Sequence, residues 1–450
     1  MTSLEKIVSL AKRRGFIYPG SEIYGGLGGT WDYGPLGVEL KNNIKREFWK
    51  SMVYERDDVV GIDSAILMNP KVWEASGHVE AFSDPLVECK ICHERIRFDQ
   101  QDDLKSHEST HKGQKVEWTE PKQFNLLVEA KLGVVEDQKS KVYLRGEITQ
   151  GVHVNFKNVL DSTRVEIPFG IAQIGKAFRN EITPGNFTFR SREFEQMELQ
   201  YYTRPDDKES QEWLDYWKEE RLKWYLSLGI SKKKLRLRQH EEKERAHYAK
   251  DAWDIEYDSP FFAKGGSASG GGWKEFEGIH NRGDWDLKRH QEYSGVDLSY
   301  FDQGSNKRFL PYTIETSGGV DRAALFFLID AYHQDGDRIV LKLHPKLTPY
   351  KVAVFPLLAN KPQLIKKARS VYELLTMNYQ LVPVAWDDRG NIGKRYFYQD
   401  EIGTPHCITV DFQTLDDDTV TIRDRDSTKQ ERFKIAELKE ILIGKLNLQN

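Results

Sequence analysis

The feature that most constrains this chain is a polar and aromatic stretch, FRNEITPGNFTFRSREFEQMELQYY, at residues 178–202. Thr-Pro-Gly-Asn at 183–186 favours a hairpin turn, and the residues after it alternate as in a strand. Because side chains of a strand alternate between its faces, the pattern predicts one polar face and one apolar face. The polar face holds Arg190, Arg192, Phe194, Gln196 and Glu198, and the apolar face holds Phe187, Phe189, Met197 and Leu199.

Two arginines and an aromatic ring on one strand face suit an anionic ligand that carries a planar ring. Guanidinium groups bind phosphates with paired hydrogen bonds, and an aromatic side chain can stack on a nucleobase. A solvated strand with cross-strand ion pairs has a similar composition. This stretch alone does not separate the two interpretations.

Two further stretches predict strands with polar faces. In YTIETSGGVDRAALFFLIDAYH (312–333), one strand face carries Thr313, Glu315 and Ser317. Gly318 and Gly319 then allow a sharp turn into a helix whose first turn carries Asp321 and Arg322. In VYLRGEITQGVHVNF (142–156), the alternation places Arg145, Glu147 and Thr149 on one face. For residues 312–333 by themselves, the alternative is a strand, turn and helix that only pack in the core. Residues 142–156 by themselves indicate no function.

The composition limits the class of protein. The 450 residues are 39% hydrophobic and 30% charged, which is typical of a globular enzyme and excludes a disordered or collagen-like chain. No run of 18 apolar residues is present, so a membrane-spanning chain is excluded. The net charge of −4 argues against holding nucleic acid by bulk positive charge. Only three cysteines and no visible targeting segment indicate a cytoplasmic protein.

The order of the expected elements indicates an α+β fold followed by a second domain. Strands separated by hairpins predict a mainly antiparallel sheet, with helices expected near 38–53 and 206–229. From Tyr350, apolar runs alternate with helical stretches, which predicts parallel strands. We therefore expect domains at 1–345 and 346–450. No GxxxxGK[ST] and no GxGxxG that opens a helix after a strand is present, so neither a P-loop nor a dinucleotide fold is supported.

Taken together, these stretches resemble the motifs of class II aminoacyl-tRNA synthetases. Residues 176–202 resemble motif 2, residues 312–333 motif 3, and a helix and strand at about 38–70 motif 1. Homodimeric glycyl-tRNA synthetases have segments similar to three of this chain: WDYGPLGVELKNNIKREFW, LRGEITQGVHVNF and IETSGGVDR. The resemblance implies a class II antiparallel sheet with flanking helices and a C-terminal α/β anticodon-binding domain.

The resemblance also implies roles for individual residues. Arg179 would contact the ATP α-phosphate and the amino-acid carboxylate, and Arg322 the γ-phosphate; both would be catalytic. Glu181 would bind the adenine amino group and Phe194 would stack on adenine. The remaining expected ATP-binding residues are Arg190 and Glu275, and the expected glycine-binding residues are Glu147, Glu198, Glu315 and Ser317.

The implied activity is formation of glycyl-adenylate from glycine and ATP with Mg²⁺, and transfer of glycine to the 3′ end of tRNA(Gly). Motif 1 would form a homodimer. Two departures from the family pattern are Arg145-Gly146-Glu147, where Arg-Pro-Glu is usual, and a long glycine-rich segment at 263–273. A class II synthetase of other specificity and a non-catalytic RNA-binding paralogue are the alternatives.

An insertion at about 86–115 has the spacing of a zinc finger. Cys89, Cys92, His107 and His111 are arranged as Cys-x2-Cys-x14-His-x3-His, and two thiolates with two imidazoles satisfy tetrahedral Zn²⁺. Phe98 and Leu104 stand at the core positions of a ββα finger. This predicts a structural zinc site; a metal-free loop is the alternative, and His93 is a competing ligand.

Two basic segments could contact RNA. Lys232, Lys233, Lys234, Arg236 and Arg238 form a basic run, for which a solvated surface is the commoner explanation. In the C-terminal part, Lys394, Arg395, Tyr396 and Tyr398 mix cations with aromatic rings, a composition that can stack splayed bases.

Overall fold

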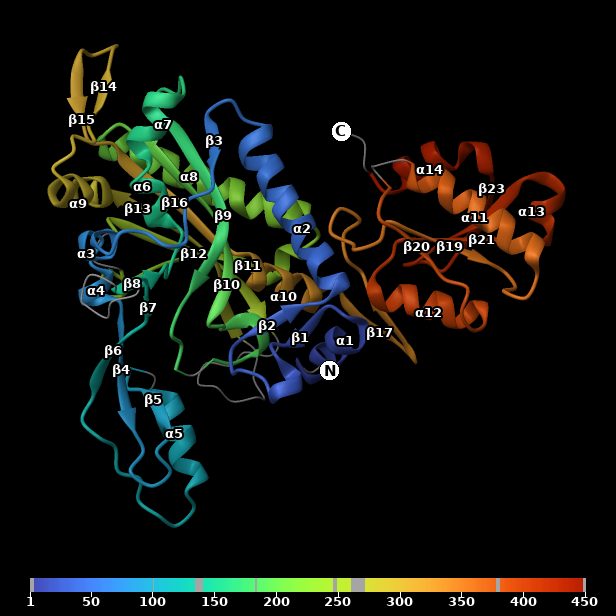
Figure 1. Ribbon diagram of the computed structural model, residues 1–450, viewed down its shortest axis with the longest axis horizontal. Coiled ribbons are helices and arrows are strands. Elements are labelled where there is room, and N and C mark those ends of the chain that lie inside the picture. Colours follow the sequence, from blue (N-terminus) through green and yellow to red (C-terminus); the bar gives the residue numbers. More distant parts are fainter. Residues whose placement is uncertain are drawn as a thin grey trace.

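A seven-stranded sheet is the centre of the computed structural model, which describes residues 4–99, 101–133, 141–182, 184–245, 249–259, 272–377 and 381–447. The strand order is β11-β12-β13-β16-β10-β9-β3, and only β3 and β9 pair in parallel (Figure 1). The strands are β3 (Val59–Ile62), β9 (Phe169–Phe178), β10 (Glu193–Thr203), β11 (Leu235–Gln239), β12 (Asp251–Ser259), β13 (Gly272–Gly283) and β16 (Tyr312–Gly319). The predicted antiparallel sheet is confirmed.

One face of this sheet packs on long helices and forms the main core. The helices are α1 (Leu4–Arg14), α2 (Pro35–Trp49), α8 (Asp207–Ser227) and α10 (Val320–Ala331). The apolar side of β10 contributes Met197 and Leu199 to this core, as its alternation predicts. Helix α8 begins where the Asp206 side chain accepts a hydrogen bond from the Glu209 backbone N–H. The other sheet face therefore remains available for polar side chains.

The remaining secondary structure of the N-terminal part is short. Its helices are α3 (Lys71–Ala75), α4 (His78–Ala81), α6 (Thr149–His153), α7 (Phe156–Ser162) and α9 (Trp285–Ser294). Its strands are β1 (Ile17–Pro19), β2 (Trp31–Tyr33), β7 (Val128–Lys131), β8 (Lys141–Leu144), β14 (Tyr300–Asp302), β15 (Lys307–Phe309), β17 (Tyr332–Asp335) and β18 (Arg338–Leu341). Within the described ranges, four 3-10 turns of this part lie at Glu22–Tyr24, Phe187–Phe189, Lys232–Lys234 and Glu242–Glu244, and a fifth lies in the C-terminal part, at Ile435–Glu437.

Three local predictions differ from the structure. The helix expected at 38–53 begins earlier, at Pro35, and continues past Trp49 as a π-helix, Lys50–Tyr54. The segment 142–156 is a strand only as far as Leu144, so Arg145, Glu147 and Thr149 do not share a strand face. The hairpin after β9 is a loop of residues 179–192 with a 3-10 turn, rather than a tight turn at 183–186. Thr183 lies outside the described residues.

The insertion projects from the body of the molecule (Figure 1). It consists of β4 (Ser83–Glu88), β5 (Arg95–Arg97), α5 (Gln101–Thr110) and β6 (Lys122–Asn125). β4 pairs with both β5 and β6 in an antiparallel sheet. Its hydrophobic cluster contains only Val87, Ile96 and Leu104, with Trp118 partly buried beside them. Phe98, expected in this core, is 45% exposed, because β5 ends one residue before it.

The C-terminal part has its own five-stranded sheet and core. The strands are β19 (Val352–Pro356), β20 (Val384–Trp386), β21 (His406–Val410), β22 (Thr419–Asp424) and β23 (Gln430–Lys434). The helices are α11 (Pro362–Thr376), α12 (Ile392–Ile402), α13 (Phe412–Asp417) and α14 (Leu438–Lys445). The first three strands are parallel, as the βα alternation predicts, whereas β22 and β23 extend the sheet in antiparallel fashion. None of the helices within the described ranges is long and apolar enough to cross a membrane.

Candidate active site

A cavity of about 340 Å³ lies on the polar face of the central sheet. Its volume is in the range of small-ligand sites. The cavity is lined by all ten residues expected to bind ATP or glycine: Glu147, Arg179, Glu181, Arg190, Phe194, Glu198, Glu275, Glu315, Ser317 and Arg322. These residues come from four separate segments of the chain, so the tertiary structure brings them together.

The pairing of β10 with β16 creates the acidic end of the cavity. Glu198 of β10 lies opposite Ser317 of β16, and the Ser317 hydroxyl donates a hydrogen bond of 2.5 Å to Glu198 Oε1. Thr149 Oγ1 lies between two carboxylates, 2.7 Å from Glu198 Oε2 and 3.0 Å from Glu315 Oε1. Glu198 and Glu315 are almost fully buried. Three carboxylates thus meet in one place, since Glu147 lines the same cavity.

The three carboxylates have different proton affinities. Burial, followed by the charges of Glu315 and Glu147, raises the pKa of Glu198 to about 8. Burial would raise the pKa of Glu147 as well, but the neighbouring His78 and then Arg282 lower it to about 2. For Glu315, Arg282 and His280 overcome the same effect of burial and hold the pKa below its usual range. Of the three carboxyl groups, that of Glu198 therefore binds its proton most tightly.

Arg282 is a central cation of this end that the sequence patterns did not indicate. Its Nη1 donates to Glu315 at 3.1 and 3.2 Å, and its Nε and Nη2 donate to Asp286 at 2.7 and 2.9 Å. Asp286 also accepts a hydrogen bond from Gln150 Nε2, at 3.0 Å. The Arg282 guanidinium therefore bridges Asp286 and Glu315 and holds the Glu315 carboxylate in position.

A β-bulge in β13 explains which of its residues face the cavity. The pairing with β12 skips Phe276, which packs in the core. In a regular strand, residues share a face only when their numbers differ by an even number. Because the bulge adds one residue, Glu275 nevertheless lies on the same face as Gly278, His280 and Arg282. His280 Nδ1 lies 2.9 Å from Glu315 Oε2. Alternation of 278, 280 and 282 was the sequence signal that could have identified His280 and Arg282.

A second group of lining residues, called the basic end below, carries arginines beside aromatic rings. The Arg179 guanidinium lies 5.3 Å from the centre of the Phe194 ring, and its Nε donates to the Gly146 carbonyl at 3.1 Å. Arg322 lies 4.6 Å from the Phe189 ring and pairs with Glu275 at 3.0 Å. The charge of Arg322 is the main cause that lowers the pKa of Glu275. The cavity therefore offers fixed cations beside a flat ring.

Two residues of the motif 2 stretch lie elsewhere than the alternation predicts. Arg192 precedes the first residue of β10, and its Nη1 donates to the Gly28 carbonyl at 2.9 Å instead of facing the cavity. Phe189, expected on the apolar face, lies in the 3-10 turn and lines the cavity. Strand alternation does not apply to either residue, because the strand begins only at Glu193.

The basic segments suggested as RNA contacts are largely paired. Lys234 pairs with Asp330 at 2.8 Å, and Arg236 with Glu256 at 2.6 Å. Arg395 is 1% exposed, and its guanidinium donates to backbone carbonyls such as that of Pro356 at 2.5 Å. Arg395 is thus a structural residue of the C-terminal part.

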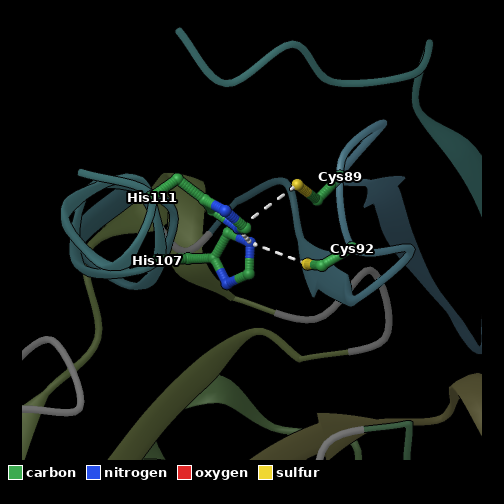
Figure 2. Close-up of side chains that lie close together, drawn as sticks. All are labelled: Cys89, Cys92, His107 and His111. Atoms are coloured by element: carbon green, nitrogen blue, oxygen red, sulfur yellow. Dashed lines mark hydrogen bonds between the residues drawn. The ribbon is translucent and has the colours of Figure 1, made fainter. Parts of the chain in front are cut away.

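The four residues with zinc-finger spacing form a compact cluster (Figure 2). Cys89 Sγ lies 3.7 Å from His111 Nε2, Cys92 Sγ lies 3.4 Å from His107 Nε2, and the two Nε2 atoms are 3.1 Å apart. Zn–S and Zn–N bonds of about 2.3 and 2.0 Å give tetrahedral edges of roughly 3.3 to 3.8 Å. His93 is excluded from the cluster, since its ring points to Glu88. These residues can hold a metal ion of the size and preference of Zn²⁺.

Comparison with known families identifies both parts of the chain. The family described as "tRNA synthetase class II core domain (G, H, P, S and T)" matches residues 131–333. The family described as "Anticodon binding domain" matches residues 351–445. Among solved structures, prolyl-tRNA synthetase from Cryptosporidium parvum, complexed with L-proline and AMP, has the same fold with a TM-score of 0.68. The identity is 16%, over 99% of this chain and 76% of that chain.

Curated relatives extend over the full chain. The glycine–tRNA ligase of Thermobifida fusca is 50% identical, covering 99% of this chain and 98% of the relative. The glycine–tRNA ligase of Borreliella burgdorferi is 51% identical, covering 97% and 96%. The glycine–tRNA ligase of Clostridium kluyveri is 50% identical, covering 99% and 98%. With this identity over nearly its whole length, the chain belongs to the glycine–tRNA ligase family of class II tRNA synthetases.

Proposed function

We propose that this enzyme activates glycine with ATP and transfers it to the 3′ end of tRNA(Gly). The observation that carries the proposal is that one cavity is lined both by the carboxylates of the acidic end and by the arginines and aromatic rings of the basic end. An amino acid with a free ammonium group suits the acidic end. A nucleoside triphosphate suits the basic end, because guanidinium groups bind phosphates and an aromatic ring stacks on a base.

In the first step, a carboxylate oxygen of glycine attacks the α-phosphorus of ATP, and pyrophosphate leaves. Negative charge accumulates on the phosphate oxygens, so fixed cations stabilise the transition state without reorganising. We assign Arg179 to the α-phosphate and the glycine carboxylate, and Arg322 to the γ-phosphate. Mg²⁺ that accompanies ATP would share this charge, and Glu275 is the carboxylate beside Arg322 that would hold it.

The adenine would stack on Phe194, which already lies beside Arg179. Glu181 would accept a hydrogen bond from the adenine amino group. Arg190 lies on the same side of the cavity, with Nε 3.9 Å from Glu181 Oε2. We assign Arg190 to ATP binding as well.

Specificity for glycine follows from the crowding of the acidic end. Glu147, Glu198, Glu315 and Ser317 would surround the ammonium group and the α-carbon of the substrate. Hydrogen bonds hold these carboxylates in position, so widening the pocket to accept a side chain would cost free energy. Because every competing amino acid is larger than glycine, exclusion by size makes an editing site unnecessary.

In the second step, a terminal ribose hydroxyl of the tRNA attacks the glycyl carbonyl, and AMP leaves. We propose that the catalytic domain spans 1–345 and that 346–450 is a domain that binds the anticodon. We further propose a homodimer through the motif 1 segment, 38–70, and a cytoplasmic location. The insertion would hold a structural Zn²⁺ at Cys89, Cys92, His107 and His111.

Glycine-dependent ATP–pyrophosphate exchange and charging of tRNA by the pure enzyme test this proposal. We expect exchange with glycine and not with serine, alanine or proline. Strong exchange with one of those amino acids, without glycine, would instead assign another class II specificity.

The variant Arg179→Ala separates catalysis from RNA binding. We expect the variant to lose adenylate formation while its affinity for tRNA stays nearly unchanged. A wild-type enzyme that binds tRNA tightly but charges none would be a non-catalytic RNA-binding protein. Equal loss of both properties in the variant would mean that Arg179 supports the fold.

A further inference from the structure

The insertion contributes to the wall of the reaction cavity, although most of it projects away from the body (Figure 1). Arg97, the last residue of β5, lines the cavity together with Arg179, Glu181 and Arg190. Leu126, directly after β6, lines it as well. The wall therefore includes a cation that belongs to none of the three class motifs.

The side chain of Arg97 is held in place by the insertion itself. Its Nη1 lies 3.0 Å from Asp84 Oδ1, and its Nε and Nη2 donate to the Asp99 carboxylate at 3.0 and 2.7 Å. A guanidinium carries five N–H donors, which is more than these contacts use. The group is thus oriented in advance and keeps donors for a ligand in the cavity.

Both ends of the insertion are anchored on residues of the active site. On one side, the ring of Phe82 lies 5.2 Å from the Arg179 guanidinium, and His78 Nε2 lies 3.3 Å from Glu147 Oε2. On the other side, the Asn180 backbone N–H donates to the Leu126 carbonyl at 2.8 Å. These contacts fix the base of the insertion relative to both ends of the cavity.

The Cys/His cluster lies close to Arg97 along the chain. Cys89 follows β4, Cys92 lies in the turn, and β5 returns with Leu86 opposite Arg97. The insertion has a three-stranded sheet and one helix, but its hydrophobic cluster has only three buried residues within the described ranges, which is a very small core. In such a module the free energy of metal binding supplies much of the free energy of folding. A bound metal would therefore hold the hairpin that carries Arg97.

We propose that Arg97 binds a nucleotide phosphate in the reaction cavity. We further propose that a metal ion bound by the insertion holds the Arg97 side chain in the cavity wall. This inference deepens the proposed function and rests on it. The phosphate has two possible sources, ATP and the 3′-terminal nucleotide of the tRNA. Both sources present the same anionic oxygens to the guanidinium group.

The test compares Arg97→Ala with Arg95→Ala in the full-length, metal-loaded enzyme. Arg95 is a matched control, since it lies on the same strand, pairs with the carboxylate of Glu88 at 3.0 Å and does not line the cavity. Loss of a charge-assisted contact should raise a dissociation constant or KM about tenfold. Metal content and the thermal unfolding midpoint of both variants show whether the fold is retained.

Two arms distinguish the sources of the phosphate. Calorimetric titration measures the dissociation constant for ATP, the first source. This measurement does not depend on which amino acid is the substrate, so it remains informative if the glycine assignment fails. The KM for tRNA in charging measures the second source. A rise in either constant for Arg97→Ala, with Arg95→Ala unchanged, supports the proposal. If the two variants behave alike in both arms, Arg97 only pairs with Asp84 and Asp99, and the proposal is wrong.

The variant Cys92→Ser tests the link to the metal. We expect loss of bound metal, faster hydrogen exchange in β4 and β5, and the same rise in dissociation constant or KM as in Arg97→Ala. In the double variant Cys92→Ser/Arg97→Ala the effects should not add. If Cys92→Ser loses the metal but binds both substrates like the wild type, the metal does not hold Arg97.

Discussion

The three glutamates of the acidic end, although chemically identical, have different roles because their neighbours differ. Glu147 lies beside His78 and Glu315 beside Arg282, whereas Glu198 accepts hydrogen bonds from hydroxyl and amide donors. Its burial and the two nearby carboxylates raise its pKa to about 8. A cationic substrate in the pocket would favour the ionised form of Glu198 and release its proton.

This proton release predicts a pH dependence of glycine binding. Below about pH 8, Glu198 of the free enzyme is mostly protonated, so binding of the ammonium group costs a deprotonation. The KM for glycine in pyrophosphate exchange should therefore fall as pH rises towards 8, at most tenfold per unit. In Glu198→Gln the KM should be higher and lack this dependence. A wild-type KM that is constant from pH 6.5 to 8 would contradict the prediction.

A second prediction at this scale concerns His280 as a positioning residue. Its Nδ1 contacts Glu315, and its ring covers Gly278, where an added Cβ would lie 2.8 Å from the ring. We expect His280→Ala to raise the KM for glycine about fivefold, with kcat nearly unchanged, because one hydrogen bond that orients Glu315 is lost. His280→Asn keeps a donor near the Nδ1 position and should restore most of the affinity. Equal KM values for the two variants would show that the hydrogen bond has no role.

At the scale of elements, close contacts between backbones decide how helices meet the rest of the fold. Helix α2 crosses the chain at Phe16 so closely that a Cβ on Gly37 would lie 1.8 Å from the Phe16 carbonyl oxygen. No rotamer change can relieve a clash with backbone. The position of α2, and with it the motif 1 segment, therefore requires glycine at residue 37.

This contact predicts opposite effects of two identical substitutions. Gly37→Ala should lower the free energy of unfolding by about 1–3 kcal/mol, because the helix must move away from Phe16. Gly444→Ala, in helix α14 with open space around the added Cβ, should raise it by up to about 1 kcal/mol. Urea denaturation followed by circular dichroism measures both. Destabilisation by Gly444→Ala equal to that by Gly37→Ala would contradict the argument.

At the scale of the whole molecule, the segment between the two sheets is tied to helix α2. Asn43 Nδ2 donates to the carbonyls of Leu347 and Thr348 at 3.2 and 2.9 Å. Lys351 Nζ donates to three carbonyls of the same segment, the shortest contact being 2.7 Å to Pro345. A further ion pair joins Arg338 to Asp400 at 2.7 Å. The orientation of the C-terminal part is therefore fixed by directed hydrogen bonds.

Loosening this segment should affect RNA-dependent steps only. In Asn43→Ala we expect the rate of tRNA charging, as kcat/KM for tRNA, to fall about tenfold, since two buried carbonyls each lose a hydrogen bond. Glycine-dependent pyrophosphate exchange should stay nearly unchanged, because neither Asn43 nor the two carbonyls that it contacts line the cavity. Asn42→Ala, at the adjacent position of the same helix, is the control. A parallel loss of exchange in Asn43→Ala would indicate that the substitution disturbs α2 itself.

Local patterns identified the regular elements well and the irregular ones poorly. The alternation of Phe194, Gln196 and Glu198 gave the correct cavity face, because these residues lie within β10. The same rule failed for Arg192, which precedes the strand, and for Thr149, which lies in a helix. The glycine-rich segment noted at 263–273 lies outside the described residues except for its last two positions.

The sequence by itself determined the strand faces, the Cys/His spacing and the family, because these depend on residues near one another in the chain or on linear similarity. Only the tertiary structure decided which charges meet. The contact of Arg282 with Glu315 and the position of Arg97 in the cavity wall depend on how segments far apart in the chain meet, and the facing of Glu275 depends on a bulge that skips Phe276. The pKa of Glu198 was likewise decided in three dimensions, since burial and charges from separate segments of the chain set it together.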